Sequence, residues 1–181
     1  EIPLRLVGSE MCIRDRLYTL QSRRSLFAAK SLLGIAEVFL ITGVEMTLFA
    51  VNGHLQQYAD VLPAGQIAYY LLCTVSVNGM LFFFEFLLTI LLKNPLPAVC
   101  VGIAGALVGL FSAFMPKVCS LFVPWGYYIP LSSYYIKDWS RDTHTVIYGV
   151  QGYQWPLLIW VLVLMSTLFV VTWHVIQKKE V

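Results

Sequence analysis

Residues 97–131 read PAVCVGIAGALVGLFSAFMPKVCSLFVPWGYYIPL, and the other segments can be placed relative to this stretch. Its first part is an almost unbroken apolar run with a stripe of glycines, which is typical of a membrane helix packed against other helices. Its second part is rich in aromatic residues and proline, which is typical of a chain that emerges at the lipid–water interface. The sequence therefore predicts a membrane-crossing helix over residues 97–115 and an external broken segment over residues 118–131.

The composition extends this prediction to the whole chain. Of its 181 residues, 59% are hydrophobic and 12% are charged, whereas soluble domains are about 45–50% apolar and about 25% charged. The hydrophobic core of a soluble protein of this length could not bury so many apolar residues, so we expect a multi-pass membrane protein. The net charge of +2 is too small to indicate a nucleic-acid partner. The 4 cysteines lack metal-ligand spacing, and we interpret them as small buried hydrophobic residues.

Residues 1–16, EIPLRLVGSEMCIRDR, show no helical or strand periodicity and no signal-peptide layout. They resemble the translation of a transposase-type sequencing adapter, because residues 5–16 match its read primer and mosaic end codon by codon. We therefore expect residues 1–16 to be an adapter-derived, disordered artefact. We also expect the native N-terminus to lie upstream of residue 17 and to be missing.

Four apolar stretches are candidates for membrane spans. A helix needs about 20 residues to cross the hydrocarbon core at about 1.5 Å rise per residue. The sequence predicts spans at about residues 31–52, 65–92, 97–115 and 156–177. The second exceeds the required length, so we expect it to be tilted. The predicted fold class is all-α, a polytopic membrane helical bundle in which residues 132–155 form a long polar loop.

The basic residues indicate the orientation. Four spans place six of them on one side, at the start of the first span, between the second and third, and after the last, against three on the other side. The positive-inside rule then puts the C-terminus in the cytoplasm. Interpreting residues 118–135 as a further span would move Lys178 and Lys179 outside, and we reject that alternative.

Three glutamates lie within predicted spans, namely Glu37 and Glu45 in the first and Glu85 in the second. A carboxylate at mid-membrane costs several kcal/mol unless it is protonated, paired or facing water. Because Glu37 and Glu45 are eight residues apart, we expect both on roughly one helix face that points into the bundle or a cavity. A structural ion pair or snorkelling to the interface is the alternative.

A small-residue face is formed in the third predicted span by Gly102, Gly105 and Gly109, the last two as a GxxxG motif. Such a face allows close approach of another helix. The motif is too common to indicate dimerisation by itself.

Motifs of catalysis are missing from the sequence. It contains no GxxxxGK[ST], no GxSxG and no HExxH, and its histidines are scattered. We expect no catalytic residue, no metal site and no cofactor. A membrane enzyme without these motifs stays open as an alternative.

Residues 20–30, LQSRRSLFAAK, form a short basic amphipathic segment whose helix Ser22 can cap. The segment is either a basic flank that sets topology or a cytoplasmic helix that touches a partner. Together with KNP at 93–95, GLFS at 109–112 and FVPWGYY at 122–128, it resembles the permeases of ABC-2 type transporters, in particular the lantibiotic-protection branch. The resemblance covers residues 17–181, and PWGYY is its most specific part.

This resemblance implies six spans per permease, of which the third to sixth are present here. It implies a second permease subunit, as a homo- or heterodimer, and a separate ABC ATPase subunit bound on the cytoplasmic side. The ATPase-coupling residues are then Ser22, Arg23, Arg24 and Lys30.

The implied function is export of a cationic antimicrobial peptide for self-protection, across the cell membrane of a Gram-positive bacterium. ATP hydrolysis would take place on the separate subunit. The residues implied for the substrate path are Glu37, Glu45, Glu85, Trp125, Tyr127 and Tyr128. The alternatives are an ABC-2 permease for another drug or ion, or an integral membrane protein without a transport function.

Overall fold

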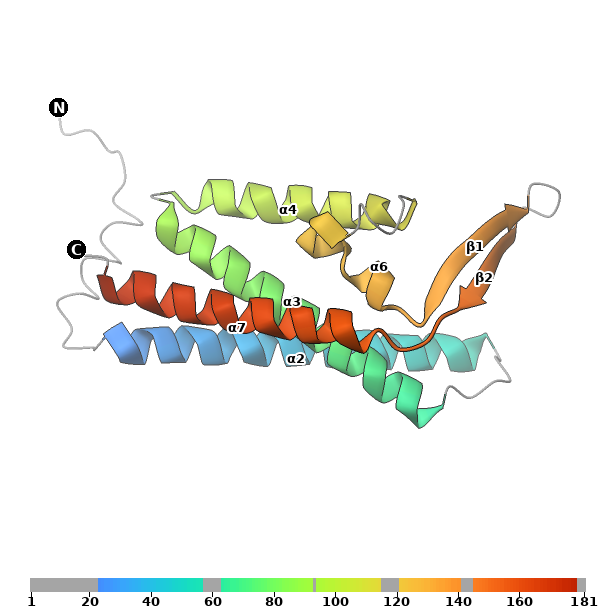
Figure 1. Cartoon of the computed structure of the whole chain (residues 1–181). Coiled ribbons are helices and arrows are strands. Elements are labelled where there is room, and N and C mark those ends of the chain that lie inside the picture. Colours follow the sequence, from blue (N-terminus) through green and yellow to red (C-terminus); the bar gives the residue numbers. More distant parts are fainter. Residues whose placement is uncertain (1–22, 57–62, 93, 115–120, 141–144, 179–181) are drawn as a thin grey trace, which may run out of the picture.

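The computed structural model describes residues 23–56, 63–92, 94–114, 121–140 and 145–178. Four helices dominate it, α2 (Arg23–Leu55), α3 (Ala64–Leu91), α4 (Leu96–Phe111) and α7 (Trp155–Lys178). Figure 1 shows that they run in alternating directions, so the starts of α2 and α4 and the ends of α3 and α7 lie at one end of the molecule. The predicted segment 1–16 and Ser22 lie outside the described residues.

Three of these helices, α2, α3 and α7, are long and apolar enough to cross a membrane. The prediction of a polytopic helical membrane protein is confirmed at this level. Helix α4 has 16 residues, or about 24 Å at 1.5 Å per residue, which is short of a hydrocarbon core of about 30 Å. A 3-10 turn, η1 (Ser112–Phe114), continues it.

Helix α2 is longer than the predicted span. The sequence separated a coupling segment at residues 20–30 from a span at residues 31–52, whereas α2 runs without interruption from Arg23 to Leu55. Its buried positions recur every three or four residues and form one stripe, which consists of Phe27, Ser31, Gly34, Val38 and Thr42. The described part of the coupling segment is therefore the first two turns of the spanning helix.

The prediction of an all-α fold is wrong in the segment after residue 132. Strands β1 (Tyr134–Ser140) and β2 (Thr145–Val150) form an antiparallel hairpin, with a register shift between Ile136 and Asp138. Both strands are rich in aromatic and β-branched residues, which favour extended structure. The charged residues of the segment led to its interpretation as a loop, although they interrupt a β-forming pattern.

Helices α3 and α7 form the main packing interface. Side chains spaced three or four residues apart on α3 meet the first turns of α7, and the buried cluster comprises Tyr69, Cys73, Val77, Met80, Leu158 and Val161, with Tyr127 and Leu131. Lipid tails are as apolar as these side chains, so close packing rather than removal of water stabilises the contact. Cys73 is buried as predicted, whereas Cys100 on α4 is exposed.

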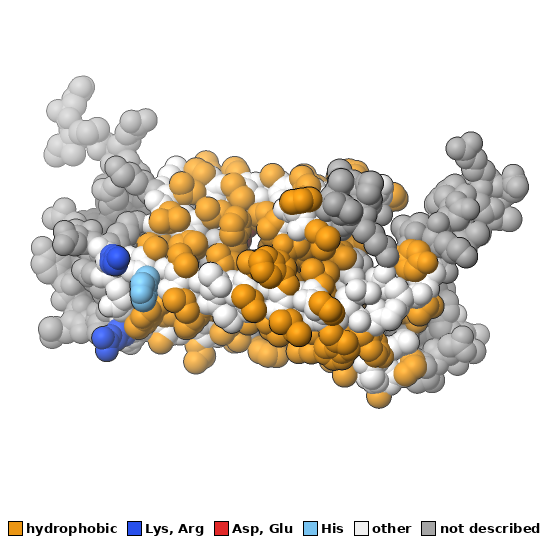
Figure 2. All heavy atoms as spheres, in the orientation of Figure 1, with side chains coloured by type: hydrophobic (Ala, Val, Ile, Leu, Met, Phe, Trp, Pro, Cys, Tyr) orange, Lys and Arg blue, Asp and Glu red, His pale blue; other side chains and the backbone are white. Residues whose placement is uncertain are grey.

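The surface of the bundle is largely apolar. Figure 2 shows hydrophobic side chains over the helices, with Lys, Arg and His side chains at one end. The exposed large apolar residues of α2 include Leu32, Leu33, Phe39, Leu40, Leu48 and Phe49. An exposed apolar surface of this extent suits contact with lipid or with other membrane helices.

The segment after α4 folds back onto the bundle. Its described part contains the 3-10 turn η2 (Pro124–Gly126) and the short helix α6 (Tyr128–Leu131), which pack against α3 and α4. Residues 121–131 thus do not extend α4 as a further long helix, which agrees with the interpretation of this segment as broken.

Candidate functional site

A cleft with a volume of about 390 Å³ opens between α2, α3 and α6. We name it the Glu45 cleft. Helix α2 contributes Ile41, Val44, Glu45 and Leu48, helix α3 contributes Tyr70, Thr74 and Asn78, and α6 contributes Tyr128. Among these lining residues Glu45 is the one charged side chain, so the cleft combines a single carboxylate with apolar, aromatic, hydroxyl and amide groups.

Glu45 reaches the cleft because it extends the buried stripe of α2. It follows Thr42 by three residues and is half-buried. Glu37 lies on the same helix but is exposed outside the stripe. Eight residues correspond to a rotation of about 80° between the two positions in an α-helix. The expectation that both glutamates point into the bundle or a cavity is therefore met by Glu45 and not by Glu37.

Tyr128 and Asn78 join α6 to α3 at the edge of the cleft. The Tyr128 hydroxyl group donates a hydrogen bond to Asn78 Oδ1. Burial of the phenol raises the pKa of Tyr128 above its ordinary value, and the nearby Glu45 carboxylate raises it further. Tyr128 therefore stays protonated at neutral pH and keeps its role as a donor.

Tyr70, which lines the cleft, also pairs with an aromatic ring of α2. The rings of Phe49 and Tyr70 lie with their centroids 6.3 Å apart at an interplanar angle of 63°. This edge-to-face geometry is a favourable one for aromatic rings. The cleft therefore offers ring surfaces from Tyr70 and Tyr128 close to the Glu45 carboxylate.

The other residues of the predicted substrate path lie elsewhere. Glu85 on α3 lies against Gly102 of α4, where an added β-carbon would collide with the carboxylate. Trp125 packs on α4, and its ring meets that of Phe84 at a centroid distance of 5.5 Å. Tyr127 is buried in the cluster between α3 and α7. Of the six predicted residues, the structure brings Glu45 and Tyr128 together.

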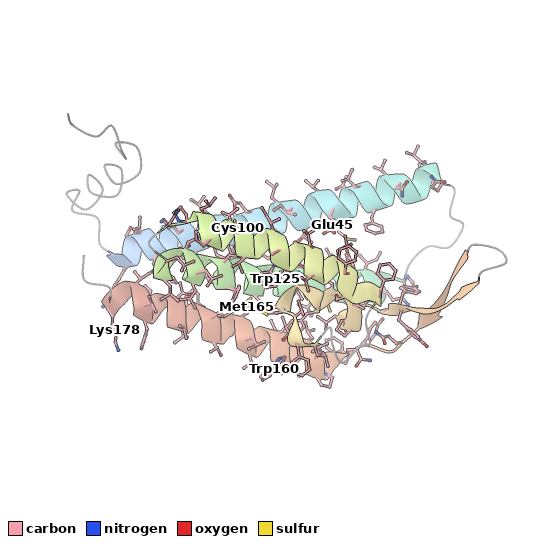
Figure 3. All side chains as sticks on the ribbon, turned by 90° about the horizontal axis from the view of Figure 1, so that it is seen from above. Glu45, Cys100, Trp125, Trp160, Met165 and Lys178 are labelled. Carbon is pink, nitrogen blue, oxygen red and sulfur yellow. The ribbon has the colours of Figure 1, made fainter. Side chains whose placement is uncertain are left out.

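The glycine face of α4 is occupied within this chain. A β-carbon at Gly105 would lie 2.6 Å from Trp125 Cε3, and one at Gly109 would lie 2.7 Å from the Trp125 carbonyl oxygen. The close approach that the three glycines allow is therefore to η2 and to Glu85 of α3. Figure 3 shows Trp125 next to α4.

Of the predicted coupling residues, Arg23, Arg24 and Lys30 are described, and they lie at the end of the molecule opposite the hairpin. Arg24 and Lys30 are exposed on the first turns of α2, and Arg23 begins that helix. Nearby, Phe27 is 2% exposed and its ring contacts those of Phe86, Phe169 and Trp173 at centroid distances of 5.9, 5.3 and 5.1 Å. This cluster attaches the basic start of α2 to α3 and α7.

Three polar residues of the cleft were not predicted as site residues, namely Tyr70, Thr74 and Asn78. They follow one another at four-residue intervals on α3, so they share one helix face. A polar stripe of this period in an otherwise apolar span is the signal that would have found them. In the part of the chain that the structure describes, no group of three His, Cys, Asp or Glu side chains could hold a metal ion.

Comparison of the chain with protein-family models, with curated proteins and with solved structures finds no match. The resemblance to ABC-2 permeases therefore stays a prediction.

Proposed function

We propose that this chain is a membrane-spanning permease subunit of an ABC exporter that expels a cationic antimicrobial peptide, such as a lantibiotic. In this proposal ATP hydrolysis takes place on a separate ABC ATPase subunit, and a second permease subunit completes the transport pathway. The chain itself carries out no catalysis. It lies in the cell membrane with four spans, and its C-terminus is in the cytoplasm.

The observation that supports the proposal most is the Glu45 cleft. A carboxylate at membrane depth is costly unless a cation or water compensates its charge. A cationic amphipathic ligand can place an ammonium or guanidinium group on Glu45 and its apolar parts on Tyr70, Tyr128 and the aliphatic side chains of α2. A cation over a tyrosine ring is itself favourable.

The continuity of α2 supports the coupling part of the proposal. Arg24 and Glu45 belong to one uninterrupted helix, and their separation of 21 positions corresponds to about 32 Å at 1.5 Å per residue. A displacement of the basic end by an ATPase subunit would therefore be carried to the cleft. Figure 3 shows Glu45 at a distance from the end of the bundle that carries Lys178.

The shared end of the helices supports the proposed orientation. Arg24 and Lys30 near the start of α2 and Lys178 in the last turn of α7 lie at the same end (Figure 1). A cytoplasmic location of this end satisfies the positive-inside rule.

A binding experiment tests the proposed ligand class. The chain in nanodiscs of zwitterionic lipid is titrated with a fluorescently labelled cationic lantibiotic, and with an analogue whose lysines are acetylated. We expect Glu45→Gln to weaken binding of the cationic peptide by about five-fold, the equivalent of one partly exposed charge pair. Glu37→Gln is the matched control and should leave the affinity unchanged. Equal binding of both peptides, or equal effects of both substitutions, would reject the ligand class.

A second experiment tests the partner. Purification of the tagged chain from its native cells should retain an ATPase whose sequence contains a P-loop. We expect its recovery to fall when Arg23 and Arg24 are both replaced by Gln, while the double variant remains in the membrane fraction. Recovery of the chain without an ATPase would favour an integral membrane protein outside ABC transport.

A further inference from the structure

A second groove lies between the ends of α3 and α7, at the end of the molecule where α2 begins. Its volume is about 480 Å³. Ile90 and Leu91 of α3 and the valines of α7 form its apolar walls, and His174 and Lys178 are its two polar lining residues. It shares no lining residue with the Glu45 cleft.

The groove changes character along α7. The lining residues of α7 lie on one face of the helix, because they recur every three or four residues. One row consists of Val171, Val175 and Lys178, and the neighbouring row of Val170, His174 and Lys178. The apolar positions lie deeper in the bundle, and Lys178 lies in the last turn of the helix. Figure 2 shows the Lys, Arg and His side chains at this end, next to hydrophobic surface.

This polarity matches that of a phospholipid. Leu91 of α3 and Val170 and Val171 of α7 are exposed on helices that can span the bilayer, so an acyl chain fits against them. The Lys178 ammonium group and the His174 ring can donate hydrogen bonds to a phosphate at the helix end. Basic pockets between transmembrane helices are known to bind anionic lipid headgroups.

The helix ends argue against a free anion at this position. Both α3 and α7 present their C-termini here, and a helix C-terminus carries about half a negative charge. An anion is therefore held only if Lys178 offsets this charge and apolar contacts add to the binding. A ligand with a phosphate and an acyl chain can interact with Lys178 and also make the apolar contacts, whereas inorganic phosphate can interact with Lys178 alone.

We propose that the groove formed by Ile90, Leu91, Val171, Val175, His174 and Lys178 binds a phospholipid with an anionic headgroup. The acyl chain lies along the aliphatic walls, and the headgroup phosphate lies at Lys178 and His174.

The test compares two lipids that differ in headgroup charge alone. The 181-residue chain is purified in neutral detergent, and native mass spectrometry measures binding of dioleoyl phosphatidylglycerol and dioleoyl phosphatidylcholine. We expect tighter binding of phosphatidylglycerol. Lys178→Gln should weaken it by about five-fold and leave phosphatidylcholine unaffected. Lys30→Gln, the same change of charge on α2 outside the groove, is the matched control and should have no effect.

A second variant tests the acyl part of the site. Val171→Trp fills the groove without altering its charge, and we expect it to reduce binding of both lipids, with the helical circular dichroism unchanged. An excess of inorganic phosphate should not displace phosphatidylglycerol. Equal binding of the two lipids would overturn the proposal, as would equal losses of phosphatidylglycerol binding in Lys178→Gln and Lys30→Gln. Unreduced lipid binding in Val171→Trp, or displacement of phosphatidylglycerol by inorganic phosphate, would overturn it too. Cross-links showing that a second copy of the chain fills the groove would overturn it as well.

Discussion

The indole ring of Trp125 lies directly on Gly105 of α4, at a distance that leaves no room for a β-carbon. One turn further along α4, the backbone of Trp125 also approaches Gly109 too closely for a β-carbon. Two glycines of a small-residue face therefore accommodate one tryptophan of the same chain. This contact holds the segment after α4 against the bundle and so positions α6, which carries Tyr128 to the Glu45 cleft.

The first prediction concerns these glycines. Gly109→Ala should destabilise the chain by about 1–3 kcal/mol, because its β-carbon meets a backbone oxygen that cannot move away easily. Gly105→Ala should also destabilise it, but in a Trp125→Ala background its cost should largely disappear because the ring is gone. Thermal unfolding in detergent measures both.

The control is Gly43→Ala on α2, where a β-carbon meets nothing within 4 Å. It should be neutral or stabilising by up to about 1 kcal/mol, because alanine favours a helix over glycine. Equal effects at Gly43, Gly105 and Gly109 would contradict the assignment of the glycine face to Trp125.

The second prediction concerns the attachment of α2. Phe27→Ala should destabilise the chain by about 3 kcal/mol, because it removes a buried ring from contact with three others. Phe39→Ala on the same helix is the matched control, since Phe39 is 59% exposed, and it should change stability by about 0.5 kcal/mol at most. A loss of stability at Phe39 as large as that at Phe27 would contradict the docking of α2 described here.

The third prediction concerns the link between α6 and α3. Tyr128→Phe removes the hydrogen-bond donor to Asn78. It should lower the free energy of unfolding by about 1 kcal/mol, a typical value for a hydrogen bond between membrane helices. A double-mutant cycle with Asn78→Ala isolates the coupling between the two residues. Tyr134→Phe is the control, because it removes a hydrogen bond of the same kind at the surface, which the Tyr134 hydroxyl group donates to Gln66 Oε1 at 3.3 Å. A coupling of zero between Tyr128 and Asn78 would contradict the contact.

The fourth prediction concerns the topology. Single cysteines are introduced at Asn94 and at Gly152 in a background without other cysteines. Asn94 precedes α4 at the end that carries Lys178, whereas Gly152 lies between the hairpin and the start of α7. A membrane-impermeant maleimide should label Gly152→Cys in intact cells and Asn94→Cys only after permeabilisation. Labelling of both from the same side would mean that α4 does not cross the membrane.

Much of the helical framework could be predicted from the sequence. Apolar runs of sufficient length indicate membrane helices by themselves, and the boundaries of α3 and α7 lie within one residue of those predicted. The start of α2 was harder, because Arg23, Arg24 and Lys30 make its first turns look like a separate cytoplasmic segment. The buried Phe27 shows that these turns belong to the bundle.

The candidate site was less predictable, because it depends on the rotation of each helix. Glu37 and Glu45 look equivalent in the sequence, and a turn of about 80° separates a lipid-facing position from one in the cleft. The glycines of α4 indicate a close neighbour without indicating which one. The hairpin was missed because the aspartates and basic residues between Tyr134 and Val150 outweighed the aromatic and β-branched residues that form its strands.

The most direct test of the central claim is the resistance of cells to a cationic lantibiotic. The chain is expressed together with its ATPase in a sensitive host, at membrane levels matched between variants. We expect Glu45→Gln to lower several-fold the lantibiotic concentration that the cells tolerate. Glu37→Gln, eight residues away on the exposed side of α2, should protect as well as the unaltered chain. Full protection by Glu45→Gln would contradict the claim that the Glu45 cleft binds the exported peptide.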